Sequence, residues 1–186
     1  MRKLTALVMV VLLGVALLAA AGCGSGDTKT AQQDLRTAEA GYNNMSSGLT
    51  QIENAVAPIV GGALTGDYTS VTVQNIQAAD TSIKSLARQA PQVSAQYAKV
   101  DGLKGVDDYK AYADAMQKVI TMSEQLLNNG ESAIQALLPL VGNTTAIQQY
   151  FQANPNLIPQ LQDEINSVNK AYNDAQQTKK DKNLTW

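Results

Sequence analysis

The stretch IQAADTSIKSLARQAPQVSAQYAKV, residues 76–100, decides the fold of this chain. Its apolar side chains recur at alternating steps of three and four residues, at Ile76, Ala79, Ile83, Leu86, Ala90, Val93, Tyr97 and Val100. A period of 3.5 residues kept over this length is typical of an α-helix that packs against other helices in a left-handed coil. Pro91 lies inside the pattern and predicts a kink there.

The same spacing recurs in three other parts of the chain. The first contains Leu35, Ala38, Tyr42, Met45, Leu49, Ile52, Val56 and Ile59; the third contains Tyr109, Tyr112, Met116, Val119, Ser123, Leu126, Gly130, Ala133 and Leu137; the last contains Ile158, Leu161, Ile165, Val168, Tyr172 and Ala175. We therefore predict helices at about 31–58, 74–101, 107–138 and 156–179, with a possible short helix at 145–153. Four such helices most simply form an all-α, antiparallel up-down-up-down four-helix bundle over residues 31–178, with heptad packing.

Helix-breaking and helix-capping residues agree with these boundaries. Pro58, followed by two glycines, predicts the end of the first helix. Asp107 is a plausible N-cap for the third helix, which Pro139 should end. Asn156 could cap the last helix.

The first 26 residues have the layout of an export signal. Arg2 and Lys3 are positive, residues 4–21 carry no charge, and small residues follow. The alternative is an N-terminal membrane helix that is not cleaved, because 18 apolar residues are close to the length that spans a bilayer.

The only cysteine of the chain favours the export signal. Ala20-Ala21-Gly22-Cys23 resembles the lipobox of bacterial lipoproteins, although that family prefers leucine where Ala20 stands. The resemblance covers residues 1–23. It implies a signal helix and signal peptide over residues 1–22, cleavage before Cys23, and acylation of Cys23. Residues 23–30 would then form a lipidated flexible tether.

This resemblance implies where the protein resides and what holds it. The protein would be exported and anchored to a bacterial membrane, on the cell surface or the periplasmic face, with membrane lipid bound through acylated Cys23. Two or three acyl chains hold a protein stably on a membrane. The sequence leaves open which membrane carries the anchor.

Composition excludes several classes of function. The chain contains no histidine, which excludes Ser-His-Asp and Cys-His catalysis and histidine-held zinc or haem. Without Arg2 and Lys3 it has 12 basic and 16 acidic residues, so no nucleic-acid surface is indicated. We expect no metal, no cofactor and no enzymatic activity.

Two long connections, 58–73 and 139–155, fall at the end of the bundle farthest from the proposed anchor. Both are longer than a bundle turn needs, and both contain apolar and aromatic residues. We predict that Tyr68, Tyr150 and Phe151 contact a partner or a ligand there, such as an envelope protein. The alternative is that the two connections only cap the core, which is the common use of apolar residues in loops.

The C-terminal tail, residues 179–186, should return toward the membrane. Lys179, Lys180, Lys182 and Trp186 are candidate membrane contacts, because lysine attracts anionic headgroups and tryptophan favours the interface. The alternative is a frayed tail whose lysines complement the negative end of the last helix.

The tyrosines at 97, 109 and 112 predict an aromatic layer in the core, with an aromatic binding box as the alternative. Taken together, these patterns favour a non-enzymatic interaction or scaffold module anchored in a membrane. The alternative function is a helical bundle that binds a small ligand or acts as a sensor. The oligomeric state is left open.

Overall fold

The computed structural model describes residues 26–186, and every regular element in that range is a helix. The α-helices are α1 (Gly26–Thr65), α2 (Val73–Ala98), α3 (Asp107–Leu137), α4 (Thr144–Ala153) and α5 (Leu157–Asp181), with 3-10 turns η1 (Lys99–Gly102) and η2 (Leu138–Leu140). The prediction of an all-α fold is confirmed for this part of the chain. The proposed signal segment and Cys23 lie outside the described residues.

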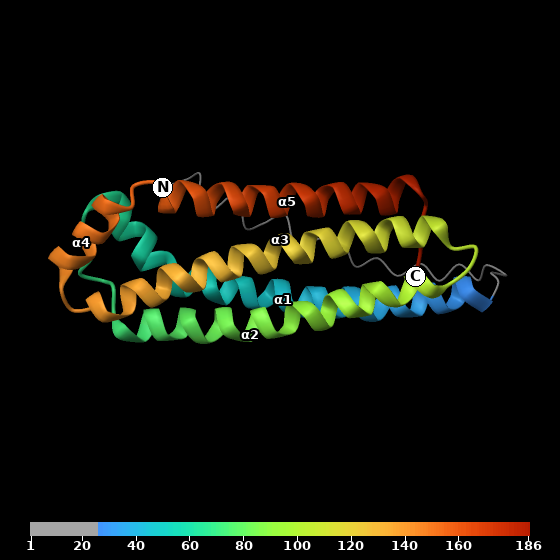
Figure 1. Cartoon of the computed structure of the whole chain (residues 1–186), viewed down its shortest axis with the longest axis horizontal. Coiled ribbons are helices and arrows are strands. Elements are labelled where there is room, and N and C mark those ends of the chain that lie inside the picture. Colours follow the sequence, from blue (N-terminus) through green and yellow to red (C-terminus); the bar gives the residue numbers. More distant parts are fainter. Residues whose placement is uncertain (1–25) are drawn as a thin grey trace.

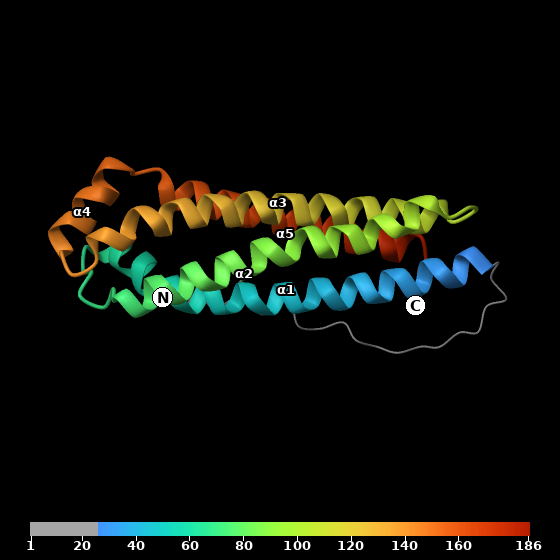
Figure 2. The same ribbon diagram turned by 60° about the horizontal axis from the view of Figure 1, so that its bottom comes forward.

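The four long helices lie along the long axis of the molecule (Figure 1). Helix α2 packs along α1 and α3, and α3 packs along α5, whereas α1 and α5 have few close backbone contacts. Helix α4 and the α1–α2 connection lie at one end, which we call the tip (residues 58–73 and 138–156; Figures 1 and 2). The start of α1, the η1 connection and the end of α5 lie at the other end, which we call the base.

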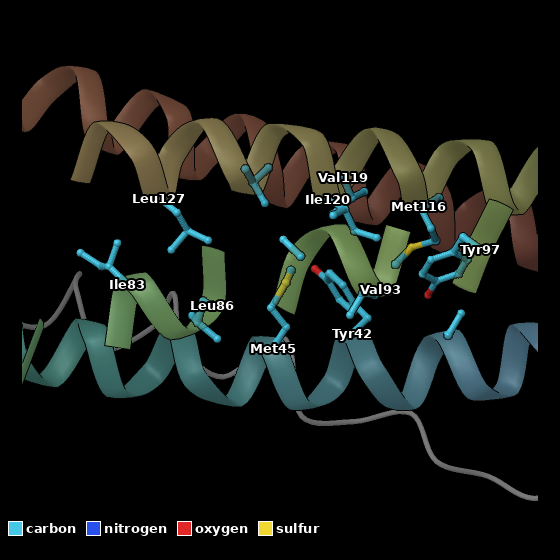
Figure 3. Close-up of a cluster of buried hydrophobic side chains, with 14 of the residues drawn as sticks. Tyr42, Met45, Ile83, Leu86, Val93, Tyr97, Met116, Val119, Ile120 and Leu127 are labelled. Carbon is cyan, nitrogen blue, oxygen red and sulfur yellow. The ribbon is translucent and has the colours of Figure 1, made fainter. Parts of the chain in front are cut away.

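The part of the core that α2 supplies is built from the apolar positions that the sequence pattern selects. All of the apolar heptad positions in residues 76–100 are buried. Figure 3 shows Ile83, Leu86, Val93 and Tyr97 of α2 beside buried side chains of α1 and α3, among them Met45, Met116 and Ile120. Each large aliphatic side chain removed from water contributes about 1.5–3 kcal/mol, so this layer is the main source of stability.

Helices α1 and α2 approach closely because α1 carries glycine where α2 carries large side chains. A Cβ atom on Gly48 would lie 2.5 Å from Leu86 Cδ2, and one on Gly41 would lie 3.2 Å from Val93 Cγ2. The two glycines are seven residues apart, as are their two partners, so the heptads of α1 and α2 are in phase along this contact.

Helix α1 is longer than predicted at its N-terminal end. The structure places Gly26–Thr30 in the helix, so the prediction of a flexible tether over 23–30 is wrong for these residues. The side chain of Asp27 accepts a hydrogen bond of 2.9 Å from the backbone N–H of Lys104. This contact fastens the first turn of α1 to the α2–α3 connection, and an acidic residue is favourable at a helix N-terminus.

The C-terminal end of α1 also lies beyond the predicted boundary. The helix continues through Pro58 to Thr65 and ends before Gly66, whose φ of +77° only glycine adopts easily. Figure 1 shows the last part of α1 turning away from the rest of the helix. We attribute this bend to Pro58, because a proline inside a helix removes one backbone hydrogen bond and kinks the helix.

The other helices begin and end close to the predicted residues. Pro91 lies inside α2, and α3 is continuous over 107–137. Asp107 is the first residue of α3 rather than its N-cap, which is Val106 without a side-chain hydrogen bond. Helix α4 corresponds to the possible short helix at 145–153, and Asn143 caps it by accepting a hydrogen bond of 3.0 Å from the N–H of Ala146. Within residues 26–186, no helix combines the length and apolar character needed to cross a membrane.

Candidate functional sites at the tip and the base

At the tip, three aromatic rings join the two long connections. The rings of Tyr68 and Phe151 stack at 5.6 Å with an interplanar angle of 4°, and Tyr150 meets Phe151 edge-on at 5.4 Å. The ring of Tyr68 also lies against Gly62, where a Cβ atom would be 2.6 Å from Tyr68 Cδ1. Tyr68 thus packs against the end of α1 on one side and, through Phe151, against α4 on the other.

This packing places two of the predicted contact residues in the core. Tyr68 is 5% exposed and Phe151 is 9% exposed, whereas Tyr150 is half-buried. Burial raises the pKa of the Tyr68 and Tyr150 hydroxyls, because the charged phenolate loses hydration. The geometry fits the capping alternative for Tyr68 and Phe151. Binding at the tip stays a prediction, and its exposed large apolar side chains are instead Leu64 (68%) and Val73 (47%).

The tip is nearly free of charge. Residues 54–79 contain one ionisable charge, Asp67, and residues 132–162 contain none. The carboxylate of Asp67 accepts hydrogen bonds from the N–H and the hydroxyl of Thr69, at 3.0 and 2.7 Å, and these bonds lower its pKa. Surfaces depleted of charge and supplied with apolar side chains resemble the centres of protein–protein interfaces.

At the base, Glu39 of α1 is the centre of a polar cluster. Its Oε1 accepts a hydrogen bond of 2.6 Å from the Tyr112 hydroxyl and pairs with Lys179 Nζ at 2.9 Å. Its Oε2 accepts a hydrogen bond of 2.7 Å from the indole Nε1 of Trp186. Gln176 completes the cluster by donating to the Tyr112 hydroxyl at 3.3 Å. The cluster joins α1, α3, α5 and the tail.

Two aromatic rings lie beside the ammonium group of Lys179, which is the cation of this cluster. The ammonium of Lys179 lies 3.7 Å from the centre of the Trp186 ring and 5.7 Å from that of Tyr112. Tyr97 meets Tyr112 edge-on at 6.2 Å, and Tyr109 lies 6.1 Å from Trp186. The predicted aromatic layer is therefore present, and the chain's own lysine and tail occupy the space that a binding box would offer.

The tail is held by a defined helix-ending motif. Asn183 has φ of +50°, and its N–H donates to the Lys180 carbonyl at 3.0 Å. The next N–H, of Leu184, donates to the Lys179 carbonyl at 2.9 Å, which is the hydrogen-bond pair of a Schellman motif. Leu184 is buried in the core. The tail is therefore not frayed as that alternative expected, because this motif returns residues 184–186 to the packed helices; Lys179 and Lys180 do lie in the last turn of α5.

The four candidate membrane residues differ in their exposure and in their partners within the chain. Lys179 pairs with Glu39, and Lys182 pairs with Asp108 at 2.8 Å, which raises the pKa of Lys182. Trp186 is half-buried and Lys180 is exposed. The structure brings Lys179 and Trp186 together. Membrane contact by these four residues stays a prediction.

Sequence reasoning missed Glu39 and Gln176. Each lies beside an apolar heptad position, after Ala38 and Ala175, where a polar residue normally reads as part of the solvated flank. The available signal was long-range: an acid near the start of the first helix and lysines near the end of the last helix would meet if these ends lie together. Spacing within one helix cannot reveal such a pair.

An open groove lies between α1 and α2. It has a volume of about 320 Å³ above Gly48, and neutral polar side chains line it: Asn44, Ser47, Gln51, Thr81, Ser82, Ser85 and Gln89. Over residues 26–186 the structure shows no group of three acidic or cysteine side chains placed to hold a metal ion.

No protein-family model matches the chain, and neither the curated proteins nor the solved structures give a match.

Proposed function

We propose that this protein is an exported bacterial lipoprotein that acts as a non-enzymatic interaction or scaffold module. Acylated Cys23 would anchor it in a membrane, and the tip would contact a partner protein of the cell envelope. The observation that carries the binding role is the exposure of Leu64 and Val73 within a tip of almost no charge. Exposed apolar groups in an uncharged surface favour contact with another protein.

We further propose that α1, α2, α3 and α5 form an antiparallel up-down-up-down four-helix bundle. Support comes from the pairing of Gly41 with Val93 and of Gly48 with Leu86, because the residue number rises along α1 as it falls along α2. The short α2–α3 connection also favours neighbours that run in opposite directions. In this arrangement, the tip lies at the end of the bundle away from Cys23.

The anchor can be tested by metabolic labelling with a clickable palmitate analogue. We expect the label and membrane association in the natural chain, and neither in Cys23→Ser. A chain that carries no label and is still membrane-bound would favour the uncleaved N-terminal helix instead.

The binding role can be tested by photo-crosslinking in intact cells. A photoreactive residue replaces Leu64 or Val73, and a control replaces the exposed Lys118 in the middle of α3. A discrete protein adduct from the two tip positions, absent from the control, supports the interaction module. No adduct from a folded, anchored protein would overturn it.

The second candidate is a bundle that binds a small ligand or acts as a sensor. The α1–α2 groove favours it, because seven neutral amide and hydroxyl side chains line a hollow of about 320 Å³. These groups suit an uncharged hydroxylated ligand. This groove lies on the side of the bundle, so crosslinks from Leu64 and Val73 separate the two candidates.

A further inference from the structure

The contact between α1 and α5 differs along its length. In the half near the base, it is closed by side chains that reach across. Glu39 pairs with Lys179, and nearer the tip, three residues on along α1 and seven back along α5, the rings of Tyr42 and Tyr172 stack at 5.3 Å with an interplanar angle of 15°. Long side chains are needed because the two backbones make few close contacts.

Toward the tip, the described residues of α1 and α5 form no ion pair or ring contact with one another, although Leu49, Ile52, Val56 and Ile158 pack at the edge of the core. The apolar heptad residues of both helices are only half-buried in this half: Leu49, Ile52 and Val56 on α1, and Ile158, Leu161 and Ile165 on α5. The corresponding residues of α2 and α3 in the same half, such as Ile83 and Leu127, are buried (Figure 3). We call these six half-buried residues the open seam.

The segments of α1 and α5 that carry the open seam contain acidic residues and no basic ones. Residues 37–65 of α1 carry Glu39 and Glu53 and no lysine or arginine. Residues 157–169 of α5 likewise carry no basic residue; of their two acids, Asp163 lies on the exposed side, and Glu164 accepts a hydrogen bond of 2.7 Å from the Asn129 side chain of α3. Glu53 is exposed and follows Glu39 by two heptads, so it lies on the same side of α1. At Glu39 this side meets Lys179 of α5, whereas the α5 residue two heptads before Lys179 is Ile165.

We propose that the open seam binds an amphipathic helix of a partner protein, whose apolar stripe is flanked by lysine or arginine. Six aliphatic side chains from two helices form the kind of surface that accepts an apolar helix face. Glu53 then pairs with a basic flank of the partner, as Glu39 pairs with Lys179 within the chain. Two copies of this protein would instead place Glu53 near acids, which disfavours self-pairing. This surface is separate from the tip and does not depend on binding there.

The test uses two dye-labelled helical peptides of 21 residues. Both carry leucine at the a and d positions of three heptads, and the flanking positions carry lysine in one and glutamate in the other. Each is titrated into the whole protein held in nanodiscs of neutral phosphatidylcholine, with empty nanodiscs as the blank, and anisotropy reports binding. We expect the lysine peptide to bind at least about tenfold more tightly than the glutamate peptide, since Glu53 attracts the first and repels the second.

Three variants assign the binding to the open seam. Glu53→Lys, an exposed change that leaves the core intact, should reverse the preference between the peptides. Asp163→Lys makes the same change in charge on the exposed side of α5 and should leave the preference unaltered. Ile165→Ser should weaken both peptides at unchanged helicity. Equal binding of the two peptides, no binding of either, or a Glu53→Lys protein that keeps the lysine preference would each overturn the proposal.

Two other occupants give different results. A second copy of the chain would appear as a dimer in sedimentation that the lysine peptide does not dissociate. The chain's own apolar residues 4–21 would block the peptide in unprocessed protein and admit it after processing. Either result would overturn the assignment to a partner helix.

Discussion

The side chains of Glu39 and Trp186 are joined by a hydrogen bond of 2.7 Å, although 147 positions separate them in the chain. The same carboxylate binds Lys179 and Tyr112, so one side chain near the start of α1 connects α3, α5 and the tail. Three partners on one half-buried acid make Glu39 a point where the base depends on a single residue.

We expect Glu39→Ala to lower the free energy of unfolding by about 2–3 kcal/mol, since it leaves several buried or half-buried donors without their acceptor. For a chain of this size, that corresponds to a fall in Tm of roughly 5–10 °C. Circular dichroism during heating measures it, and Trp186 fluorescence should report solvent exposure in the same variant. The control is Asp163→Ala on the exposed side of α5, which should stay within about 0.5 kcal/mol. Equal melting of the two variants would contradict the central role of Glu39.

Replacing either of two neighbouring glycines at the end of α1 by alanine should change the stability of the protein in opposite directions. A Cβ atom on Gly62 would lie 2.6 Å from Tyr68 Cδ1 and 2.9 Å from the Asp67 carbonyl oxygen, whereas one on Gly61 would meet nothing within 4 Å. We expect Gly62→Ala to destabilise by about 1–3 kcal/mol through overpacking. Gly61→Ala should stabilise by about 0.5–1 kcal/mol, because alanine favours the helix. Chemical denaturation of the pair is the measurement, and similar stabilities would show that Tyr68 does not pack against Gly62.

Alkaline pH should unfold the protein cooperatively. Burial raises the pKa of Tyr42, Tyr97 and Tyr112 above the ordinary value near 10. Between the unfolded and folded pKa values, the unfolded state has lost protons that the folded state keeps. The contribution of these tyrosines to the free energy of unfolding is therefore constant below about pH 10. Above that pH, it falls by about 1.4 kcal/mol per pH unit for each tyrosine.

Absorbance of tyrosinate at 295 nm, followed together with far-ultraviolet circular dichroism, measures this transition. The two signals should change together, because the buried rings ionise only when the helices unfold. Tyr97→Phe removes one of these groups, so it should raise the midpoint pH and leave the ring contact with Tyr112 in place. Ionisation of most tyrosines while the helices stay intact would show that the rings are accessible in the folded state.

Substitutions at the tip should lower stability where the side chain is buried and leave it unchanged where the side chain is exposed. Tyr68→Ala removes a buried ring from its stack on Phe151 and should cost about 3–5 kcal/mol. Leu64→Ser changes a side chain that is 68% exposed and should leave Tm nearly unchanged. Differential scanning calorimetry of both variants tests this contrast. A large loss of stability in Leu64→Ser would show that Leu64 serves the fold instead of the surface.

Periodicity predicted the helices well because the core follows it. The apolar positions of residues 76–100 are all buried, and α3 begins at the predicted residue. The end of α1 was placed too early, since a helix can accommodate Pro58 by bending when tertiary contacts continue beyond it.

The base could not be predicted in this way. The contacts of Glu39 join residues far apart in the chain, and a pattern within one helix carries no information about them. That Ile158 and Ile165 are only half-buried could not be predicted from the sequence pattern either, for a related reason. The heptad identifies the face of α5 that is apolar, but the distance between α1 and α5 decides how far that face is covered.

The early start of α1 has a mechanical consequence. Gly26, the first residue of the helix, follows Cys23 by three positions, and three extended residues span about 10 Å at most. A helix of 40 residues is about 60 Å long. In a chain acylated at Cys23, almost the whole distance from lipid to tip is therefore a rigid rod with little slack. If the proposed anchor and tip contact hold, the length of the helices would set the height above the membrane at which a partner is reached, and partners much nearer or farther would be missed.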